Sequence, residues 1–203
     1  FTFDFGSFKR KNPLAAMVAF AKAFPKESDV RLVFKTMGAK SHRSEKELLE
    51  QEAVKLGIEK RFTIITEYLS HSELYGLTAA CDVYISLHKG EGFGIGMAEA
   101  MLMGKPVIAT NWSANTEFCK PGCSFPVDYK LVPVLPNEYF LSMKDPSPTH
   151  SPGRFCRNSQ PTFCLLSFRI SPHISPSVLS TSPATRRFSE SKDFRGRDFL
   201  KKV

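Results

Sequence analysis

The chain has 203 residues, 42% of them hydrophobic and 24% charged, which is the composition of a globular protein with one core of ordinary size. No run approaches the roughly 18 apolar residues that a membrane-spanning helix needs. The formal net charge of +8 does not favour a nucleic-acid-binding face, because it lies in residues 141–203, with 11 Lys and Arg against 4 Asp and Glu, whereas residues 1–140 hold 17 against 16.

The first residues and the cysteines bear on whether the chain is part of a longer protein and on its cellular compartment. FTFDFGSFKRKNP contains no initiator Met and no signal-peptide pattern, so we expect the chain to begin inside a longer protein. The five cysteines are odd in number and form no CxxC pair, which favours neither a disulfide framework nor a zinc site. We therefore expect a cytoplasmic location.

Up to about residue 130, short β-rich runs alternate with helical runs, which is typical of βαβ units and a mostly parallel sheet. Pro13 suits a first helical turn, and Ser70 with Glu73 has the pattern of a capping box. The expected strands are residues 1–5, 31–37, 62–65, 83–87 and 106–109. The expected helices are residues 13–24, 44–55, 70–80 and 94–103. The fold class is therefore α/β: a Rossmann-like parallel sheet with flanking helices, followed by an atypical Ser/Pro-rich tail.

The composition changes abruptly after about Asn137. Half of the 14 prolines lie between Pro146 and Pro183, and this stretch contains no Asp or Glu. Such a segment cannot readily build a packed layer. A natural disordered linker and an out-of-frame segment both stay open. The expected division of the chain is a globular lobe at 1–140, a Ser/Pro-rich segment at 141–191 and a short helix at 192–203.

The most informative segment is residues 88–118, HKGEGFGIGMAEAMLMGKPVIATNWSANTEF, which follows a strand and opens a helix. In an open parallel sheet, ligands bind at the carboxyl ends of the strands, where a glycine-rich turn aims backbone N–H groups at a polar or anionic ligand. Glu91 lies in this turn, and Glu99 lies five residues beyond Gly94, about 7 Å further along the helix. Two carboxylates so placed can hold two hydroxyl-bearing parts of one extended ligand.

The E-x7-E spacing within EGFGIGMAEAMLMGKPVIAT, with the turn NWSANTEF after it, resembles the signature of retaining GT-B glycosyltransferases of family four. The opening FDFGSFKRKNPLAAMVAF resembles the first strand, phosphate loop and helix of the C-terminal, donor-binding lobe in that family. The resemblance covers about residues 1–132. It implies a nucleoside diphosphate sugar as co-substrate, no metal ion and no other cofactor.

The resemblance implies a role for each residue of the motif. Glu91 would accept hydrogen bonds from hydroxyls of the donor sugar, and Glu99 would bind the ribose hydroxyls of the nucleotide. The backbone of the turn would lie beside the donor. Its residues are Gly92, Phe93, Gly94 and Ile95.

At the phosphate end, Lys11 matches the lysine that neutralises the donor diphosphate, and Arg10 would assist it. A solvated basic loop is the alternative for both. The arginine that the family carries in a Gly-Arg pair is absent, since this chain has Gly6-Ser7, which leaves the second phosphate contact open.

For the histidines His42, His71 and His88, whose mutual spacing suits neither a metal site nor a nucleophile-base pair, we expect surface or capping roles.

The implied activity is transfer of a hexose, with retention of configuration, to a saccharide or lipid-linked acceptor. The acceptor would be held by an N-terminal lobe before residue 1, so the chain alone is expected to be inactive. A nucleotide-sugar epimerase or phosphorylase of similar fold, or an inactive nucleotide-binding fragment, stays open. No nucleic-acid partner is expected, and peripheral association of the parent enzyme with the inner face of the membrane stays open.

Overall fold

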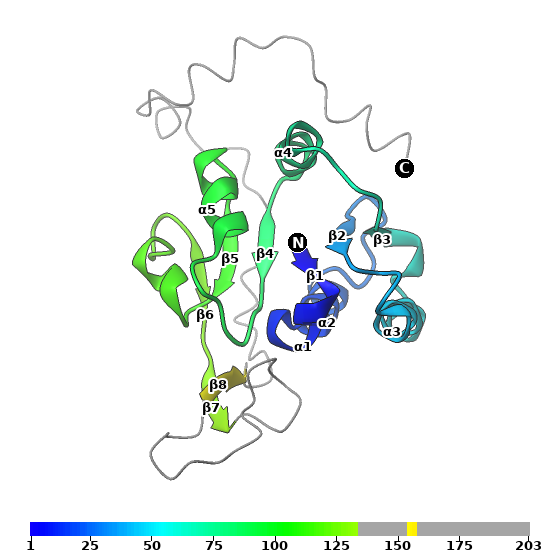
Figure 1. Cartoon of the computed structure of the whole chain (residues 1–203), viewed down its shortest axis with the longest axis horizontal. Helices are drawn as coiled ribbons and strands as arrows, with labels where there is room; N and C mark the ends of the chain where they lie inside the picture. Colours follow the sequence, from blue (N-terminus) through cyan, green and yellow to red (C-terminus); the bar gives the residue numbers. More distant parts are fainter. Residues whose placement is uncertain (134–153, 158–203) are drawn as a thin grey trace.

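The computed structural model of the chain describes residues 1–133 and 154–157 (Figure 1). Its strands are β1 (Thr2–Asp4), β2 (Leu32–Met37), β3 (Phe62–Ile65), β4 (Tyr84–Ser86), β5 (Val107–Thr110), β6 (Phe125–Val127), β7 (Lys130–Pro133) and β8 (Arg154–Arg157). Its α-helices are α1 (Phe8–Lys11), α2 (Pro13–Ala23), α3 (Arg43–Lys55), α4 (His71–Ala80) and α5 (Ile95–Leu102). Every strand and helix expected up to residue 110 forms, with ends that differ by at most one residue.

The strands form two three-stranded parallel sheets and one antiparallel pair. In the first sheet β2 lies between β1 and β3, and in the second β5 lies between β4 and β6, while β7 pairs with β8. Parallel pairing across intervening helices is what βαβ units produce. The expected α/β class is confirmed, and its parallel sheet is divided between β1 and β4.

The order of the strands sets where a ligand can bind. Because β4 lies beside β1 (Figure 1), the order from edge to edge is β3-β2-β1 followed by β4-β5-β6. This is the Rossmann order, in which the chain starts in the middle and winds outward in both directions. A hydrogen bond between Tyr84 of β4 and Thr2 of β1 links the two sheets. Ligands of such folds bind at the carboxyl ends where the order reverses, which here means after β1 and β4.

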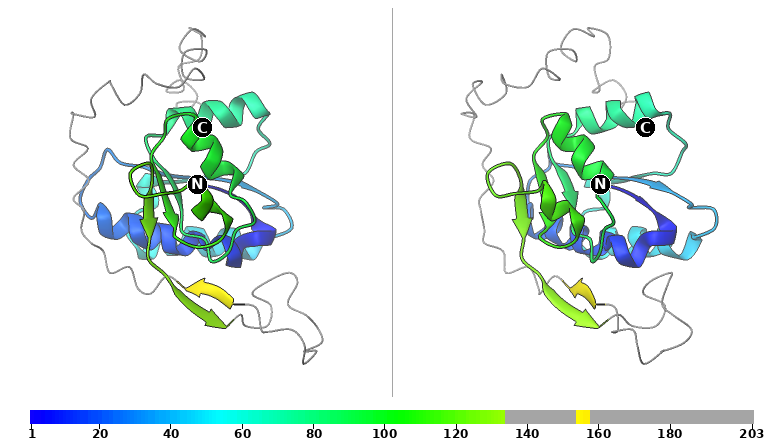
Figure 2. Two further views of the ribbon diagram at one scale, coloured as in Figure 1. Left: turned by 90° about the vertical axis from the view of Figure 1, so that its left-hand side faces the viewer. Right: turned by 60° about the vertical axis from the view of Figure 1, so that its left-hand side comes forward.

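The helices lie on both sides of the strands. Helix α4 lies across the strands from α2 and α3 (Figure 2), and α5 packs against β4 and β5. Pro13, which has no N–H to leave unpaired, opens α2, and Met17 and Phe20 bury its inner side in the core of the first sheet. The mostly charged α3 buries Leu49 and Ala53.

Helix α4 begins with the capping box that the sequence predicts. Glu73 N donates a hydrogen bond to Ser70 Oγ at 3.3 Å, and Ser70 N donates to Glu73 Oε2 at 2.8 Å. Two backbone N–H groups at the helix start are thereby satisfied. The capping box fixes the first residue of α4 and, with it, the direction of each side chain along the helix.

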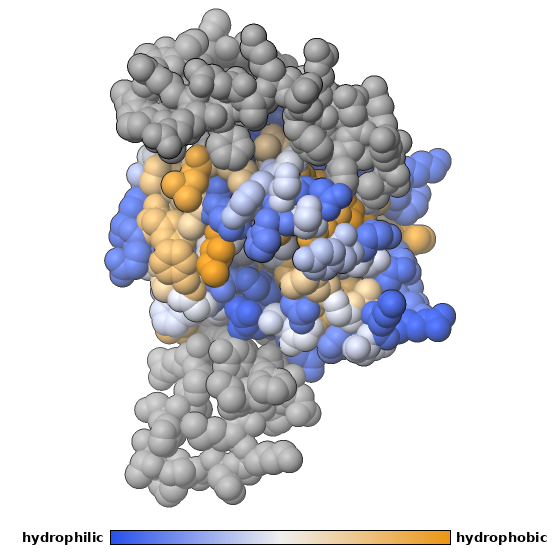
Figure 3. All heavy atoms as spheres, turned by 45° about the horizontal axis from the view of Figure 1, so that its top comes forward, coloured by the Kyte–Doolittle hydropathy of each residue, from blue (hydrophilic) through white to orange (hydrophobic). Residues whose placement is uncertain are grey.

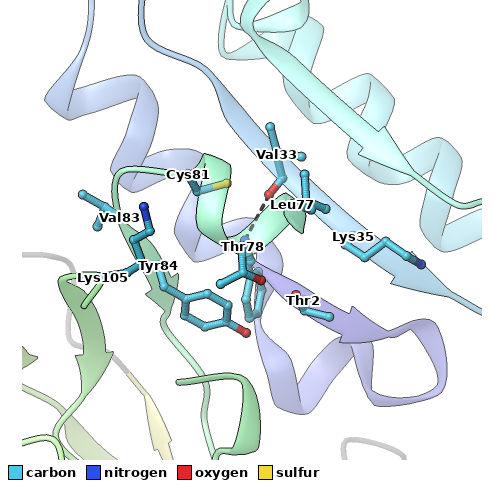
Figure 4. Close-up of a pocket in the computed structure, with 10 residues that line it drawn as sticks. Thr2, Val33, Lys35, Leu77, Thr78, Cys81, Val83, Tyr84 and Lys105 are labelled. Atoms are coloured by element: carbon cyan, nitrogen blue, oxygen red, sulfur yellow. Dashed lines mark hydrogen bonds between the residues drawn. The ribbon is translucent and has the colours of Figure 1, made fainter. Parts of the chain in front are cut away.

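A pocket lies between the amino ends of β1 and β4 (Figure 4). Beside it, the Phe1 amino group donates to Val33 O at 3.0 Å. The pocket is lined by Phe1, Thr2, Val33, Lys35, Leu77, Thr78, Cys81, Val83, Tyr84 and Lys105. Because Rossmann-type sheets bind their ligands at the opposite, carboxyl ends of the strands, the functional site lies elsewhere.

Apolar residues gather on the surface where α5 lies (Figure 3). The large exposed apolar side chains of α5 and of the turn before it are Phe93, Ile95 and Leu102. None of the helices in the described part of the chain is long and apolar enough to cross a membrane.

The predicted Ser/Pro-rich segment at 141–191 lies outside the described residues, apart from β8. Residues 154–157 pair with β7 in register, with Leu131 opposite Cys156. The predicted helix at 192–203 and the boundary at residue 140 also lie outside the described residues, so the division into three segments stays a prediction.

Candidate functional site

The site is built where the segments after β1 and β4 meet. Asn12 Nδ2 donates to Leu87 O at 2.9 Å, and Lys89 N donates to Arg10 O at 2.8 Å. Asn12 has a left-handed backbone (φ +55°), which asparagine tolerates better than most residues and which ends α1 one residue before Pro13. These bonds join residues more than 70 positions apart in the sequence. The carboxyl ends of β1 and β4 are thereby held side by side.

A cluster of opposite charges occupies this junction. Lys11 Nζ donates directly to Glu91 Oε2, and Arg10 Nη1 lies 3.5 Å from Glu91 Oε1. The Glu91 side chain is 10% exposed. Burial by itself raises the pKa of Glu91, but the hydrogen bond and charge of Lys11, together with the charge of Arg10, hold that pKa below its usual range. Glu91 is therefore an anion with two cationic neighbours, Lys11 and Arg10.

Arg10 also makes contacts of its own. Its Nη1 donates to Gly90 O at 2.9 Å and its Nη2 to Ser7 Oγ at 3.2 Å. The Arg10 guanidinium thus reaches Ser7, the residue after Gly6. These contacts make Arg10 a fixed part of the junction rather than a solvated basic residue.

A third loop, the one after β5, closes the other side of Glu91. Glu91 N donates to Ser113 Oγ at 3.1 Å, and Gly92 N donates to Glu91 Oε1 at 3.1 Å. Ser113 has φ +80°, a left-handed value that costs energy for any residue other than glycine. The strained Ser113 backbone places its hydroxyl under the Glu91 turn, a contact that the sequence pattern did not reveal.

His88 contradicts the expectation of a surface or capping role, because it is 0% exposed. Its Nε2 lies 3.1 Å from both Trp112 O and Asn115 Oδ1, two acceptors, so Nε2 carries a hydrogen. Asn115 Nδ2 donates to Thr110 O at 3.0 Å, which turns Oδ1 toward the ring. His88 Nδ1 lies 3.1 Å from Ser86 Oγ. Burial lowers the pKa of His88, so the ring is neutral and ties the loops after β4 and β5 together.

The other two histidines lie nearer the surface. His71 is exposed at the first position of α4, whereas His42 precedes α3 and lies 3.6 Å from Glu45. His42 makes no side-chain capping bond. The expectation of a surface role thus holds for His71.

The glycine-rich turn leads from Glu91 into α5. Gly94 has φ +94°, and a Cβ there would overlap the Met97 side chain, so the turn requires glycine at this position. Phe93 and Ile95, on either side of it, are 56% and 65% exposed. Both side chains are thus more than half in solvent, although the Phe93 ring lies 5.3 Å from the Phe118 ring between ring centres.

Glu99 lies in the middle of α5 and outside the Lys11 cluster. Tyr75 of α4 donates a hydrogen bond from its hydroxyl to Glu99 Oε1 at 3.1 Å. Gly96 lies in the first turn of α5, before Glu99, and its missing side chain leaves room for the Tyr84 hydroxyl. Burial raises the pKa of Tyr84 to about 12 and keeps it neutral. The structure thus brings Lys11, Arg10 and Glu91 into one cluster and places Glu99 at a second position.

This arrangement can bind an extended ligand that is anionic at one end and rich in hydroxyl groups. Lysine and arginine side chains attract phosphate oxygens, and carboxylates accept hydrogen bonds from hydroxyls. Among the described residues, no group of three or more His, Cys, Asp or Glu side chains could hold a metal ion.

The family described as Glycosyl transferases group 1 matches residues 5–138 of the chain. None of the curated proteins compared with the chain matches it. The HepE protein (Alr3699) of Anabaena, solved with UDP and glucose, is 24% identical with a TM-score of 0.49, over 63% of this chain and 34% of that one.

Two further solved structures are similar. The C-terminal domain of LpcC, a glycosyl transferase group 1 family protein from Francisella tularensis, is 25% identical with a TM-score of 0.49, over 55% of each chain. OtsA is 10% identical with a TM-score of 0.50, over 62% of this chain and 32% of that one, which shows a shared fold alone. The chain spans about a third of the length of the HepE and OtsA chains. Because the family pattern extends over more than half of the sequence and includes the whole candidate site, the chain belongs to the group 1 glycosyl transferases, as the resemblance predicts.

Proposed function

We propose that the chain is the donor-binding lobe of a retaining glycosyltransferase, which transfers a hexose from a nucleoside diphosphate sugar to a saccharide or lipid-linked acceptor. The observation that supports this most is the Lys11–Glu91 pair at the carboxyl ends of β1 and β4. In this pair a cation suited to phosphate lies beside an anion suited to sugar hydroxyls, which supports a ligand with both groups.

In the proposed complex the sugar donor binds both Lys11 and Glu91, and these contacts replace the direct contact between the two side chains. The diphosphate takes Lys11, with Arg10 beside it, and the hexose hydroxyls take Glu91. When the bond to the hexose breaks, negative charge develops on the departing nucleoside diphosphate, and a fixed cation stabilises it in the transition state. The backbone N–H groups of the turn from Gly92 to Ile95 lie next to Glu91 and face the same ligand.

Glu99 binds the other end of the donor in this proposal. A carboxylate can accept hydrogen bonds from both hydroxyls of a ribose ring, and such bonds to a charged group are worth about 1.5–3 kcal/mol. Glu91 and Glu99 therefore report on different parts of the ligand.

The acceptor belongs to a part of the enzyme outside the described lobe. The chain spans about a third of the HepE chain, and we propose that a second lobe supplies the acceptor contacts. The 203-residue chain should accordingly show no sugar transfer to any acceptor. Robust transfer by the purified chain would contradict this, and epimerised or phosphorolysed product would favour the alternative enzyme classes.

Calorimetry with UDP and UDP-glucose tests the proposed division of roles. Glu99→Gln should weaken the binding of free UDP about ten-fold or more. Glu91→Gln should leave free UDP binding nearly unchanged but weaken UDP-glucose. Glu59→Gln, an exposed change in the turn before β3, is the control and should alter neither.

Two results would contradict the proposal. Equal losses of free UDP in both glutamate variants would show that the two residues do not divide the ligand between them. No binding of UDP or of GDP, with or without a linked sugar, would remove the site altogether.

A further inference from the structure

Tyr75 of α4 contacts the candidate site through a hydrogen bond to Glu99. Its hydroxyl donates to Glu99 Oε1 at 3.1 Å and so joins α4 to α5. No group among the described residues donates to the second oxygen, Oε2. The carboxylate is thus held at one oxygen and open at the other.

Several contacts fix the place of Tyr75. The capping box at Ser70 sets the start of α4, one turn before Tyr75. The buried Leu77 anchors the helix to the fold. The ring of His71 lies 6.3 Å from the Tyr75 ring, one helical turn away. A phenol held in this way presents its hydroxyl in one direction.

A glutamate on a helix surface otherwise has three side-chain torsions to fix when it binds a ligand. Ordering such a side chain costs up to about 1.5–2 kcal/mol of entropy. A donor that already holds one carboxylate oxygen removes part of this cost before the ligand arrives. The hydrogen bond to Glu99 also raises the pKa of Tyr75. A tyrosine hydroxyl with the ordinary pKa of about 10 is already a donor at neutral pH, so this one is as well.

We propose that Tyr75 is a positioning residue for the nucleotide, which holds the Glu99 carboxylate so that it accepts the ribose 2′ and 3′ hydroxyls. This inference rests on the proposed role of Glu99 as the ribose ligand. Tyr75 does not touch the ligand itself; it acts through Glu99.

The test compares two nucleotides that differ in the ribose hydroxyls. Calorimetry on the 203-residue chain would measure the affinity of Tyr75→Phe for UDP and for 2′,3′-dideoxy-UDP. We expect a loss of about three- to ten-fold for UDP, the range of one hydrogen bond, and no loss for the dideoxy nucleotide. In the Glu99→Gln background, Tyr75→Phe should cause little further loss of UDP affinity, because the two residues act as one unit.

Tyr129→Phe is the matched control. It removes a phenol hydroxyl while the ring keeps its packing on Trp112, 5.1 Å away between ring centres. It should leave both affinities unchanged. A purely structural role of Tyr75 would lower the affinity for both nucleotides equally and would overturn the inference.

The outcomes also separate this inference from the proposed function. UDP binding that depends on Glu99 but not on Tyr75 would overturn the positioning role alone. Failure of the wild-type chain to bind UDP would overturn both, because there would be no ribose site to position.

Discussion

The two halves of the described fold are stabilised in different ways. The half built on β1, β2 and β3 has a core of twelve buried residues, six of them phenylalanine. The half built on β4, β5 and β6 has a smaller core of six, with Tyr84 as its aromatic member. This second half has five buried polar residues, Ser86, His88, Thr110, Asn115 and Ser124, whereas the first half has two, Lys35 and Thr36.

The difference follows from what each half must do. Apolar packing is non-directional, whereas a hydrogen bond fixes the orientation of both partners. His88 and Asn115 tie the loops after β4 and β5 together, and this contact brings Ser113 under the Glu91 turn. Among the described residues, every buried side-chain nitrogen or oxygen has a partner. The half that presents the glutamates therefore uses directed bonds in place of a large apolar core.

The largest expected effect is in the aromatic half. Phe34 is fully buried, and its ring meets Phe3 at 5.7 Å and Phe62 at 5.0 Å, both edge to face. Phe34→Ala should lower the free energy of unfolding by about 3–5 kcal/mol, through lost burial and the cavity left behind. Urea unfolding measures this. Phe125→Ala, at a half-exposed position of β6, is the control with a much smaller loss, and a similar loss in both variants would break the comparison.

In the polar half, adding apolar surface should destabilise the fold. Asn115→Leu keeps the approximate size of the side chain but removes one of two donors to Thr110 O, which keeps Trp112 N. It also removes one of two acceptors of His88 Nε2, which keeps Trp112 O. A hydrogen bond contributes about 0.5–1.5 kcal/mol, so the loss of these two should lower the free energy of unfolding by about 1–3 kcal/mol. The exposed Asn111→Leu, on the same loop, should change it by less than about 0.5 kcal/mol. A neutral Asn115→Leu would show that apolar packing suffices here as well.

Local elements of the fold could be predicted from the sequence, whereas contacts between distant segments could not. The strand at 62–65 and the capping box of Ser70 and Glu73 have the bounds and bonds expected, because local patterns encode them. The resemblance supplied Lys11 and Glu91 as partners of one ligand. The direct contact between them depends on β1 and β4 lying side by side, which is a property of the whole fold.

The polar network of the second half was not predicted. His88 was expected near the surface, although Tyr84, Ser86 and His88 alternate along β4 and its extension, a period-two pattern that marks one face of a strand. The partners of His88 Nε2 lie 24 and 27 residues further along the chain. Tyr75 gave no signal, because a tyrosine at helical spacing is usually a packing residue. Such contacts require the loops to be placed in space.

A third prediction tests the close approach of α5 to β4. A Cβ at Gly96 would overlap the Tyr84 hydroxyl and lie 3.2 Å from Tyr84 Cζ. Gly96→Ala should therefore lower the free energy of unfolding by about 1–3 kcal/mol, despite the better helix propensity of alanine. Adding Tyr84→Phe, which removes the hydroxyl, should recover part of the loss in a double-mutant cycle. Gly92→Ala, with no atom within 4 Å of the added carbon, is the control; a loss as large as that of Gly96→Ala would exclude the steric explanation.

The smallest expected effect is a pH dependence carried by His88. Burial lowers the pKa of His88 in the folded protein, while the unfolded chain has the ordinary value of about 6.5. The unfolded state then binds more protons between these two values, so the stability is complete above about pH 6.5 and falls as the pH drops below it. Burial and the Lys11 charge both lower the pKa of His88, and together they outweigh the Glu91 charge and the hydrogen bonds to Trp112 and Asn115, which raise it.

Urea unfolding at pH 7.5, 6.5 and 5.5 measures this dependence. The Phe1 amino group, whose pKa burial lowers to about 6, weakens the fold in the same direction from about pH 8 downward. The share of His88 is therefore the difference between the wild-type chain and His88→Gln, which has no ring to titrate. Below pH 6.5 the wild-type chain should lose stability faster than His88→Gln, by at most about 1.4 kcal/mol per pH unit, the limit for one proton. His71→Gln, at an exposed position of α4, should keep the wild-type slope. If His88→Gln also kept it, the neutral, buried ring would not be the pH-sensitive element of the polar half.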